Sequence, residues 1–140
     1  MQLGTQIASA YALVILMTLV HAFGVVLITK LLKLDDESLR AHRLDIRAYG
    51  LLISMALSLF ALHTLEIGLF ALFYIGVGAI QDLEPALYFS TSAYATLGHP
   101  DIDFPDKWRL VGAVEGLAGF LLIGWSTAVF VTDMNKLLRK

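Results

Sequence analysis

Three long apolar stretches separated by short charged segments dominate the hydrophobic pattern of this chain. The first covers residues 7–28 without a charged side chain, the second covers 48–80 with Glu66 as its sole formal charge, and the third covers 108–134 with Glu115 in its first half. At about 1.5 Å per residue, each stretch is long enough as a helix to cross a hydrocarbon core of about 30 Å. The pattern therefore predicts three transmembrane helices.

The connection between the second and third stretches does not have the composition of an ordinary solvated loop. Residues 86–97 are mostly apolar or hydroxylated, and Pro85 follows the acidic Asp82 and Glu84, as is typical of a helix start. A helix over 85–95 would be about 17 Å long and would reach only halfway through a membrane. Backbone that returns from that depth must be buried by protein or lined by water. The segment therefore predicts a re-entrant pore helix followed by a loop over 96–101, with the carboxyl end of the helix favouring a cation at the membrane centre.

Composition supports a membrane protein and narrows the possible chemistry. Hydrophobic residues make up 58% of the 140 residues and charged residues only 16%, whereas charged residues alone reach about 25% in a soluble domain. The chain has no cysteine, which excludes disulfides, thiolate metal sites and cysteine nucleophiles. We find no nucleophile–base pair, phosphate-binding glycine loop or basic patch, so neither an enzyme nor a nucleic-acid-binding protein is expected.

The charges are segregated in a way that predicts the orientation of the chain. Basic residues flank the first loop and fill the tail, at Lys30, Lys33, Arg40, Arg43, Arg47, Lys136, Arg139 and Lys140. The other connection, 81–107, is strongly acidic. Because basic loops stay in the cytoplasm, we expect the N-terminus outside, the C-terminus inside, and a location in the bacterial inner membrane or plasma membrane.

Several motifs in the second half of the chain resemble potassium channels. The sequence Thr-Leu-Gly-His-Pro-Asp at 96–101 resembles the Thr-Val-Gly-Tyr-Gly-Asp selectivity filter, and Ala-Leu-Tyr-Phe-Ser at 86–90 resembles the pore helix of small bacterial members. Residues 108–110 and 115–126 resemble the inner helix of that group. The chain thus resembles the small bacterial, two-pore-domain-like pore-loop potassium channels with an altered filter. The first helix is an addition to their plan, and we expect it to be peripheral.

The resemblance implies a set of functional residues and a homotetramer around one axis. Carbonyl oxygens in such filters replace the hydration shell of K⁺. Carried over by position, K⁺ would be bound at Thr96, Leu97 and Gly98, with His99 and Pro100 completing the filter. Asp101 would form a carboxylate ring at the mouth. The resemblance further implies filter support from Tyr88, Phe89, Ser92 and Glu115, and a possible hinge at Gly119.

Two residues of the filter depart from the family pattern. His99 stands at the position of the family's Tyr, and Pro100 at that of its second Gly. Proline cannot adopt the positive φ open to glycine, and it restricts the residue before it to extended conformations. We expect the outer ion sites to widen or vanish, which would weaken selectivity for K⁺ over Na⁺. One alternative is a nonconducting pore-loop homologue. A ring of His99 side chains near the axis could also repel cations when acid protonates it, unless His99 simply faces solvent beside Asp101.

Ionisable residues also occur at mid-membrane positions in the first two helices. His21 lies near the middle of the first helix, and His63 lies near the middle of the second with Glu66 one turn further on. One interpretation is a hydrogen bond that ties the two helices together. Another is a membrane anchor subunit in which His21 and His63 ligate a b-type haem. Glu115 is expected to bond the pore-loop backbone or to pair with Arg109.

Taken together, the sequence predicts an all-α membrane protein, with three transmembrane helices plus a re-entrant pore helix and filter loop, forming a potassium-channel-like tetramer. Residues 1–46 would supply the extra helix and a cytoplasmic loop. Residues 47–140 would form the pore domain, with an outer helix over 48–80, a pore helix over 85–95, a filter over 96–101 and an inner helix over 108–134. The expected partners are the lipid bilayer and permeant monovalent cations, with no organic cofactor.

Overall fold

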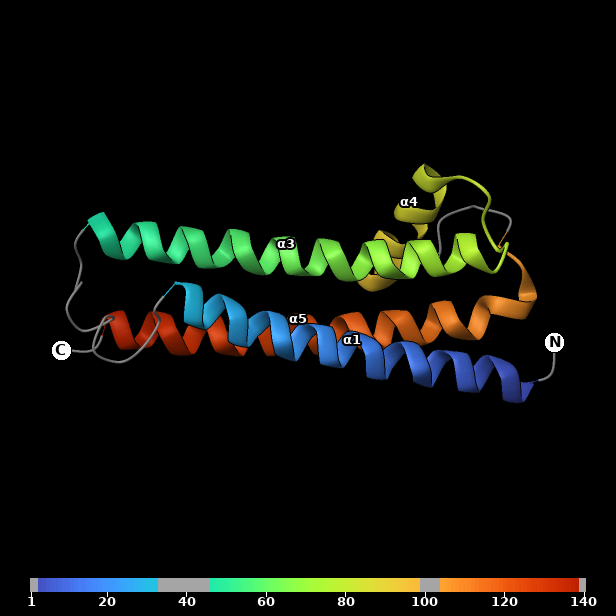
Figure 1. Ribbon diagram of the computed structural model, residues 1–140, viewed down its shortest axis with the longest axis horizontal. Helices are drawn as coiled ribbons and strands as arrows, with labels where there is room; N and C mark the ends of the chain where they lie inside the picture. Colours follow the sequence, from blue (N-terminus) through green and yellow to red (C-terminus); the bar gives the residue numbers. More distant parts are fainter. Residues whose placement is uncertain (1–2, 33–45, 99–103, 139–140) are drawn as a thin grey trace.

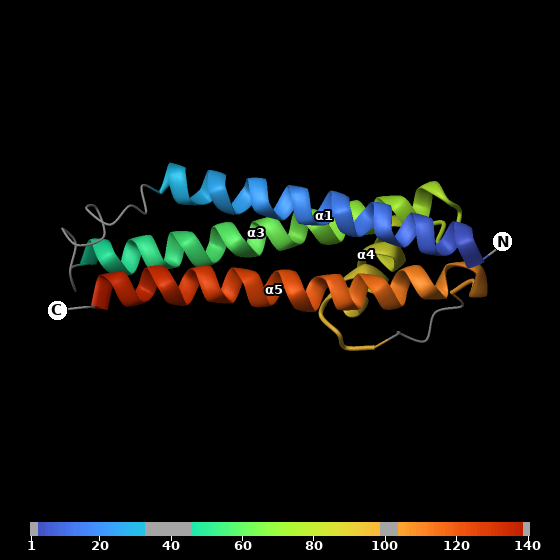
Figure 2. The ribbon, with the colours of Figure 1, turned by 90° about the horizontal axis from the view of Figure 1, so that it is seen from below.

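The computed structural model describes residues 3–32, 46–98 and 104–138, and within these ranges every regular element is helical. Three long helices, α1 (Leu3–Leu31), α3 (Ile46–Gly76) and α5 (Arg109–Leu138), lie side by side along the long axis of the molecule (Figures 1 and 2). A short helix, α4 (Leu83–Tyr94), packs beside them, and a single 3₁₀ turn, η1 (Asp106–Trp108), precedes α5. The predicted all-α architecture is confirmed.

The long helices run in alternating directions. The N-terminal end of α1 and the short helix α4 lie toward one end of the bundle, and the C-terminus lies at the opposite end (Figures 1 and 2). Within the described residues, three segments are long and apolar enough to cross a membrane, namely Leu3–Leu31, Ala48–Gly76 and Asp106–Lys136. Many large apolar side chains on these helices are exposed, among them Leu19, Phe23, Leu57, Phe60, Phe120 and Leu121. Such surfaces suit contact with lipid, as expected of a multi-pass membrane protein.

The second long helix is shorter than the hydrophobic pattern predicts, ending at Gly76 rather than at residue 80. Gly78 has a φ of +64°. Its N–H donates to the carbonyl of Ile75 at 3.0 Å, and the N–H of Ala79 donates to the carbonyl of Tyr74 at 2.8 Å. This is the Schellman arrangement that ends many helices, and it needs a residue that tolerates positive φ. The apolar residues 77–80 therefore form a turn.

The short helix begins two residues before the predicted start. Asp82 is extended at the N-cap (φ −107°, ψ 148°), and Glu84 lies in the first turn. Pro85 is thus the third helical residue, not the first. This is tolerated because the first four N–H groups of a helix have no partner within it.

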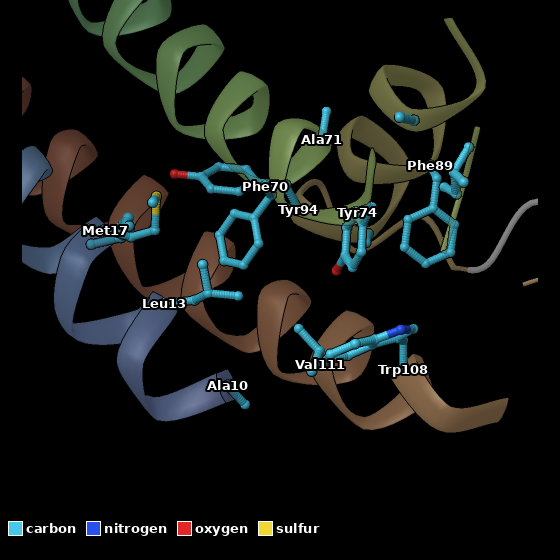
Figure 3. Close-up of a cluster of buried hydrophobic side chains, with 14 residues drawn as sticks. Ala10, Leu13, Met17, Phe70, Ala71, Tyr74, Phe89, Tyr94, Trp108 and Val111 are labelled. Atoms are coloured by element: carbon cyan, nitrogen blue, oxygen red, sulfur yellow. The ribbon is translucent and has the colours of Figure 1, made fainter. Parts of the chain in front are cut away.

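The main core lies at the end of the bundle that holds α4. Its buried side chains come from every helix: Ala10, Leu13 and Met17 of α1 lie near Phe70 and Tyr74 of α3 and Tyr94 of α4 (Figure 3). Aromatic rings join α4 to the chain that follows it. Phe89 stacks on Phe104 at a centroid distance of 4.0 Å, and Tyr74 meets Phe89 edge-on at 5.2 Å. These ring contacts hold one face of α4 against α3 and against the segment that follows α4.

The first helix is part of this packing and does not stand apart from it. At the other end of the bundle, Val25 shares a second buried cluster with Met55, Leu59 and Leu62 of α3. Gly24 allows the close approach, because a Cβ at that position would lie 2.8 Å from the Leu62 Cδ2 atom. α1 therefore contacts α3 along most of its length.

Candidate pore helix and filter segment

The carboxyl end of α4 is closed by a specific backbone motif. The N–H of Thr96 donates to the carbonyl of Ala93, and the N–H of Leu97 donates to the carbonyl of Ser92, both at 2.9 Å. This is again a Schellman arrangement, but the residue in the left-handed conformation is Thr96, with a φ of +58°. A β-branched residue seldom adopts that conformation, which costs about 1–2 kcal/mol. The chain thus leaves α4 through a strained turn at the first predicted ion-binding residue.

The residues predicted to bind ions follow this turn on the surface of the single chain. Thr96, Leu97 and Gly98 are all exposed, Leu97 to 79%. Gly98 has a φ of +99°, a conformation that glycine adopts at little cost and that other residues rarely adopt. His99, Pro100 and Asp101 lie outside the described residues.

The predicted supporting residues occupy different surroundings on α4. Phe89 and Ser92 are buried within the chain, whereas Tyr88 is 62% exposed. Tyr88 therefore lies on the face of α4 that this chain leaves uncovered. Its predicted role in filter support stays a prediction.

Glu115 joins three helices. Its carboxyl group is buried and accepts a hydrogen bond from the Tyr74 hydroxyl of α3 at 2.6 Å and another from the Ser90 hydroxyl of α4. The Ser90 hydroxyl has a single proton, and its oxygen also lies 2.9 Å from the Ile67 carbonyl oxygen, so the two acceptors compete for that proton. The expected partnership with Arg109 is wrong, since Arg109 pairs with Asp106 at 2.8 Å on the exposed surface. The reason is position: Glu115 lies six residues, about 1.7 turns, further along α5, beside the Ser90 hydroxyl of α4.

Two glycines let α4 approach α5 closely. A Cβ on Gly116 would lie 3.0 Å from the Ala93 carbonyl oxygen, and a Cβ on Gly119 would overlap the carbonyl oxygen of Tyr94. The last turn of α4 therefore lies directly on the backbone of α5. This contact gives Gly119 a packing role in addition to its predicted role as a hinge.

A second polar cluster lies further along the bundle, on the side of α1. Glu66 is fully buried and takes hydrogen bonds from His21 Nδ1 at 2.9 Å, from His63 Nδ1 at 3.0 Å and from the Tyr94 hydroxyl. On its other edge, the His21 ring places Nε2 3.4 Å from Ser126 Oγ. Three donors around one carboxylate compensate for its burial in an apolar region. The predicted hydrogen bond between the first two long helices is confirmed, and Tyr94 extends it to α4.

The same cluster argues against a haem between the two histidines. In a bis-histidine haem, the imidazoles lie on opposite faces of the macrocycle. Here the ring centroids are 5.4 Å apart, and both Nδ1 atoms point to one carboxylate. The two imidazoles therefore converge on one side chain and do not flank a macrocycle.

Sequence reasoning missed the hydroxyl partners of the two glutamates, Tyr74, Ser90 and Tyr94. A partial signal exists, because Ser90 and Tyr94 lie four residues apart and so share a face of α4. Which glutamate each of these hydroxyls meets depends on how the helices are rotated about their axes. The hydrophobic pattern does not specify that rotation here.

We expect Tyr94→Phe to destabilise the protein by about 1–2 kcal/mol, because it removes a hydrogen bond to a buried carboxylate while keeping the ring. Thermal unfolding in detergent measures the effect. Tyr11→Phe is the matched control, since Tyr11 is 68% exposed and should change stability by less than about 0.5 kcal/mol. Equal effects of the two substitutions would contradict the assigned role of Tyr94.

A groove runs along the junction of α4 and α5. It has a volume of about 380 Å³ and is lined on one side by Ala93, Thr96 and Gly98 and on the other by small and apolar residues of α5, namely Gly112, Ala113, Gly116, Leu117 and Phe120. The segment after α4 therefore borders an open apolar surface.

Comparison with known proteins agrees with this arrangement. No curated protein and no solved structure gives a significant match to the chain. Residues 60–136 match the family model described as "Ion channel", and this match spans more than half of the 140 residues, from the middle of α3 through α4 to the end of α5. The chain therefore belongs to this ion-channel family.

Proposed function

We propose that four copies of this chain surround a central pore and conduct monovalent cations passively, with K⁺ among the permeant ions. The observation that carries the proposal is the placement of α4. It is a helix of 12 residues, about 18 Å long, held on its buried face by α3 and α5, and it delivers Thr96, Leu97 and Gly98 to an exposed surface. Non-helical backbone at membrane depth is tolerated only where protein buries it or where it lines a water-filled cavity.

The exposed groove beside Thr96 supports assembly of several copies. One chain cannot encircle an ion, and filters of this kind are built from rings of carbonyls. The groove of about 380 Å³ beside the filter segment offers an apolar surface that a neighbouring copy can cover. In the assembly we propose, Leu97 and Tyr88, both exposed in the single chain, face the neighbour or the pore.

The orientation we propose places the N-terminus outside and the C-terminus in the cytoplasm of a bacterial inner membrane or plasma membrane. The distribution of basic residues supports it. The N-terminal end of α1 and the helix α4 lie toward the same end of the bundle (Figure 1), so a re-entrant loop entering from outside is compatible with this orientation.

Reconstitution of the purified protein in liposomes tests the proposed conduction. With K⁺ inside and Na⁺ outside, we expect K⁺ efflux that empty liposomes lack, and a clear reduction in Thr96→Ala. Thr64→Ala is the matched control, because the Thr64 hydroxyl is exposed and bonds its own helix at Phe60. Absence of flux from the unmodified, correctly folded protein would instead favour a nonconducting homologue.

Selectivity is expected to depend on His99 and Pro100. We expect His99→Tyr combined with Pro100→Gly to move the reversal potential in mixed K⁺ and Na⁺ toward the K⁺ equilibrium potential, because glycine permits the positive φ that proline forbids. His99→Tyr alone is the control and should change selectivity less, since Pro100 still restricts the backbone. Strong K⁺ selectivity in the unmodified protein would refute this expectation.

A further inference from the structure

The cluster around Glu66 has the composition of a metal site. One ligand atom from each of His21, His63 and Glu66 lies within 4.8 Å of the others. The residues come from α1 and α3, and the Tyr94 hydroxyl of α4 lies 2.9 Å from His63 Nδ1. Three helices thus bring nitrogen and oxygen donors to one point inside the bundle.

We propose that His21, His63 and Glu66 bind a divalent transition-metal ion of the Zn²⁺ or Cu²⁺ class. Two imidazoles and one carboxylate are a donor set that these ions favour, whereas Ca²⁺ and Mg²⁺ favour oxygen ligands. All three ligands belong to one chain, and occupancy of the site can be measured without any assay of conduction.

The distances require only a small rearrangement to admit an ion. His21 Nδ1 lies 2.9 Å from Glu66 Oε1, and His63 Nδ1 lies 3.0 Å from Glu66 Oε2. In a tetrahedral site with bonds of about 2.0–2.1 Å, neighbouring ligand atoms are about 3.3–3.4 Å apart. Each imidazole nitrogen must therefore move a few tenths of an ångström away from the carboxylate oxygen that it contacts, and no two of the three ligand atoms lie more than 4.8 Å apart. The Tyr94 hydroxyl or a water molecule can fill the fourth position.

The surroundings of His21 allow the change of tautomer that metal binding needs. Without metal, His21 donates from Nδ1 to Glu66. With metal at Nδ1, the proton moves to Nε2, which then needs an acceptor. Ser126 Oγ lies 3.4 Å from Nε2, and a hydroxyl can either donate or accept. Ser126 would thus serve as the outer partner that orients a metal-bound imidazole.

The ion has a route to these ligands. His63 is 15% exposed, whereas His21 and Glu66 are fully buried. His63 and Ser126 both line a groove of about 300 Å³ between α3 and α5. An ion entering this groove meets His63 first.

Tryptophan fluorescence provides a test that does not depend on activity. The Trp125 ring lies 5.2 Å from the His21 ring, and the chain has only two tryptophans. Cu²⁺ bound at the cluster would quench Trp125. We expect saturable quenching by Cu²⁺ in the purified, detergent-solubilised protein, reversal by excess Zn²⁺, and loss of this component in Trp125→Phe.

Substitutions of the proposed ligands test where the ion binds. His63→Gln and His21→Gln should abolish the saturable phase, and Ser126→Ala should weaken Cu²⁺ binding about tenfold or more. His42→Gln and His99→Gln remove the other two histidines and should leave the quenching unchanged. If His21→Gln does not fold, the more accessible His63→Gln still decides the question. Quenching that is absent, rises linearly without saturation, or persists in His63→Gln would overturn the proposal.

Discussion

Gly119→Ala is expected to displace the last turn of α4 and to abolish the proposed conduction. The new Cβ would overlap the Tyr94 carbonyl oxygen, and a backbone atom can move only if the helix moves with it. Overpacking usually costs about 1–3 kcal/mol, and a rigid backbone obstacle places this substitution at or above the upper end. Thermal unfolding in detergent and K⁺ flux in liposomes would report the two effects.

Two further glycines of α5 serve as controls for this prediction. Gly124→Ala adds the same methyl group where nothing lies within 4 Å, so it should be neutral or should stabilise the helix by up to about 1 kcal/mol. Gly116→Ala should be intermediate, because its Cβ would lie 3.0 Å from the Ala93 carbonyl oxygen. If all three substitutions change stability and flux alike, the change reflects the helix propensity of alanine and not the close approach of α4 to α5.

The long helices were predictable because each is a continuous apolar run of membrane-spanning length. The short helix was predictable from its acidic start and its apolar length, and the error at its beginning is two residues. The end of α3 was predicted four residues too late. Residues 77–80 continue the apolar pattern, and hydrophobicity cannot distinguish an apolar turn from a further turn of helix. Gly78 was the available sign, since a glycine after a helix often adopts positive φ.

The polar contacts could be foreseen only in part. Glu66 and the two histidines were predicted to meet because they lie at similar depths on successive helices. The partners of Glu115 were not, because an apolar helix without a polar face leaves its rotation unspecified. The same limit applies to Gly119, whose role in close packing depends on which side of α5 faces α4.

The contacts of α1 change the role expected of the first helix. The family match begins at residue 60 and leaves out α1, and the sequence predicted a peripheral helix. His21 nevertheless donates to Glu66, which also accepts from Tyr94 at the end of α4. A shift of α1 therefore changes the surroundings of the carboxylate to which Tyr94 donates, two residues before the filter segment. Glu66 of α3 thereby couples α1 to α4.

Glu115→Ala is expected to cause the largest loss of stability among the polar substitutions, about 2–5 kcal/mol. It leaves a cavity where α3, α4 and α5 meet, and it removes the acceptor of the buried Tyr74 hydroxyl. Water is scarce at that depth, so the orphaned hydroxyl has no replacement partner. We expect a lower thermal unfolding midpoint and reduced K⁺ flux.

Glu115→Gln separates the charge of the carboxylate from its shape and its hydrogen bonds. Its amide has nearly the same shape, accepts from Tyr74 with its oxygen and donates to the Ser90 oxygen with its nitrogen, while Ser90 keeps its bond to the Ile67 carbonyl. Most of the stability lost in Glu115→Ala should therefore be retained. Glu84→Ala is the second control: that carboxylate is exposed in the first turn of α4, and its loss should cost no more than about 1 kcal/mol. If Glu115→Gln unfolds as readily as Glu115→Ala, the charge of the carboxylate and not its shape and hydrogen bonds holds α4 in place.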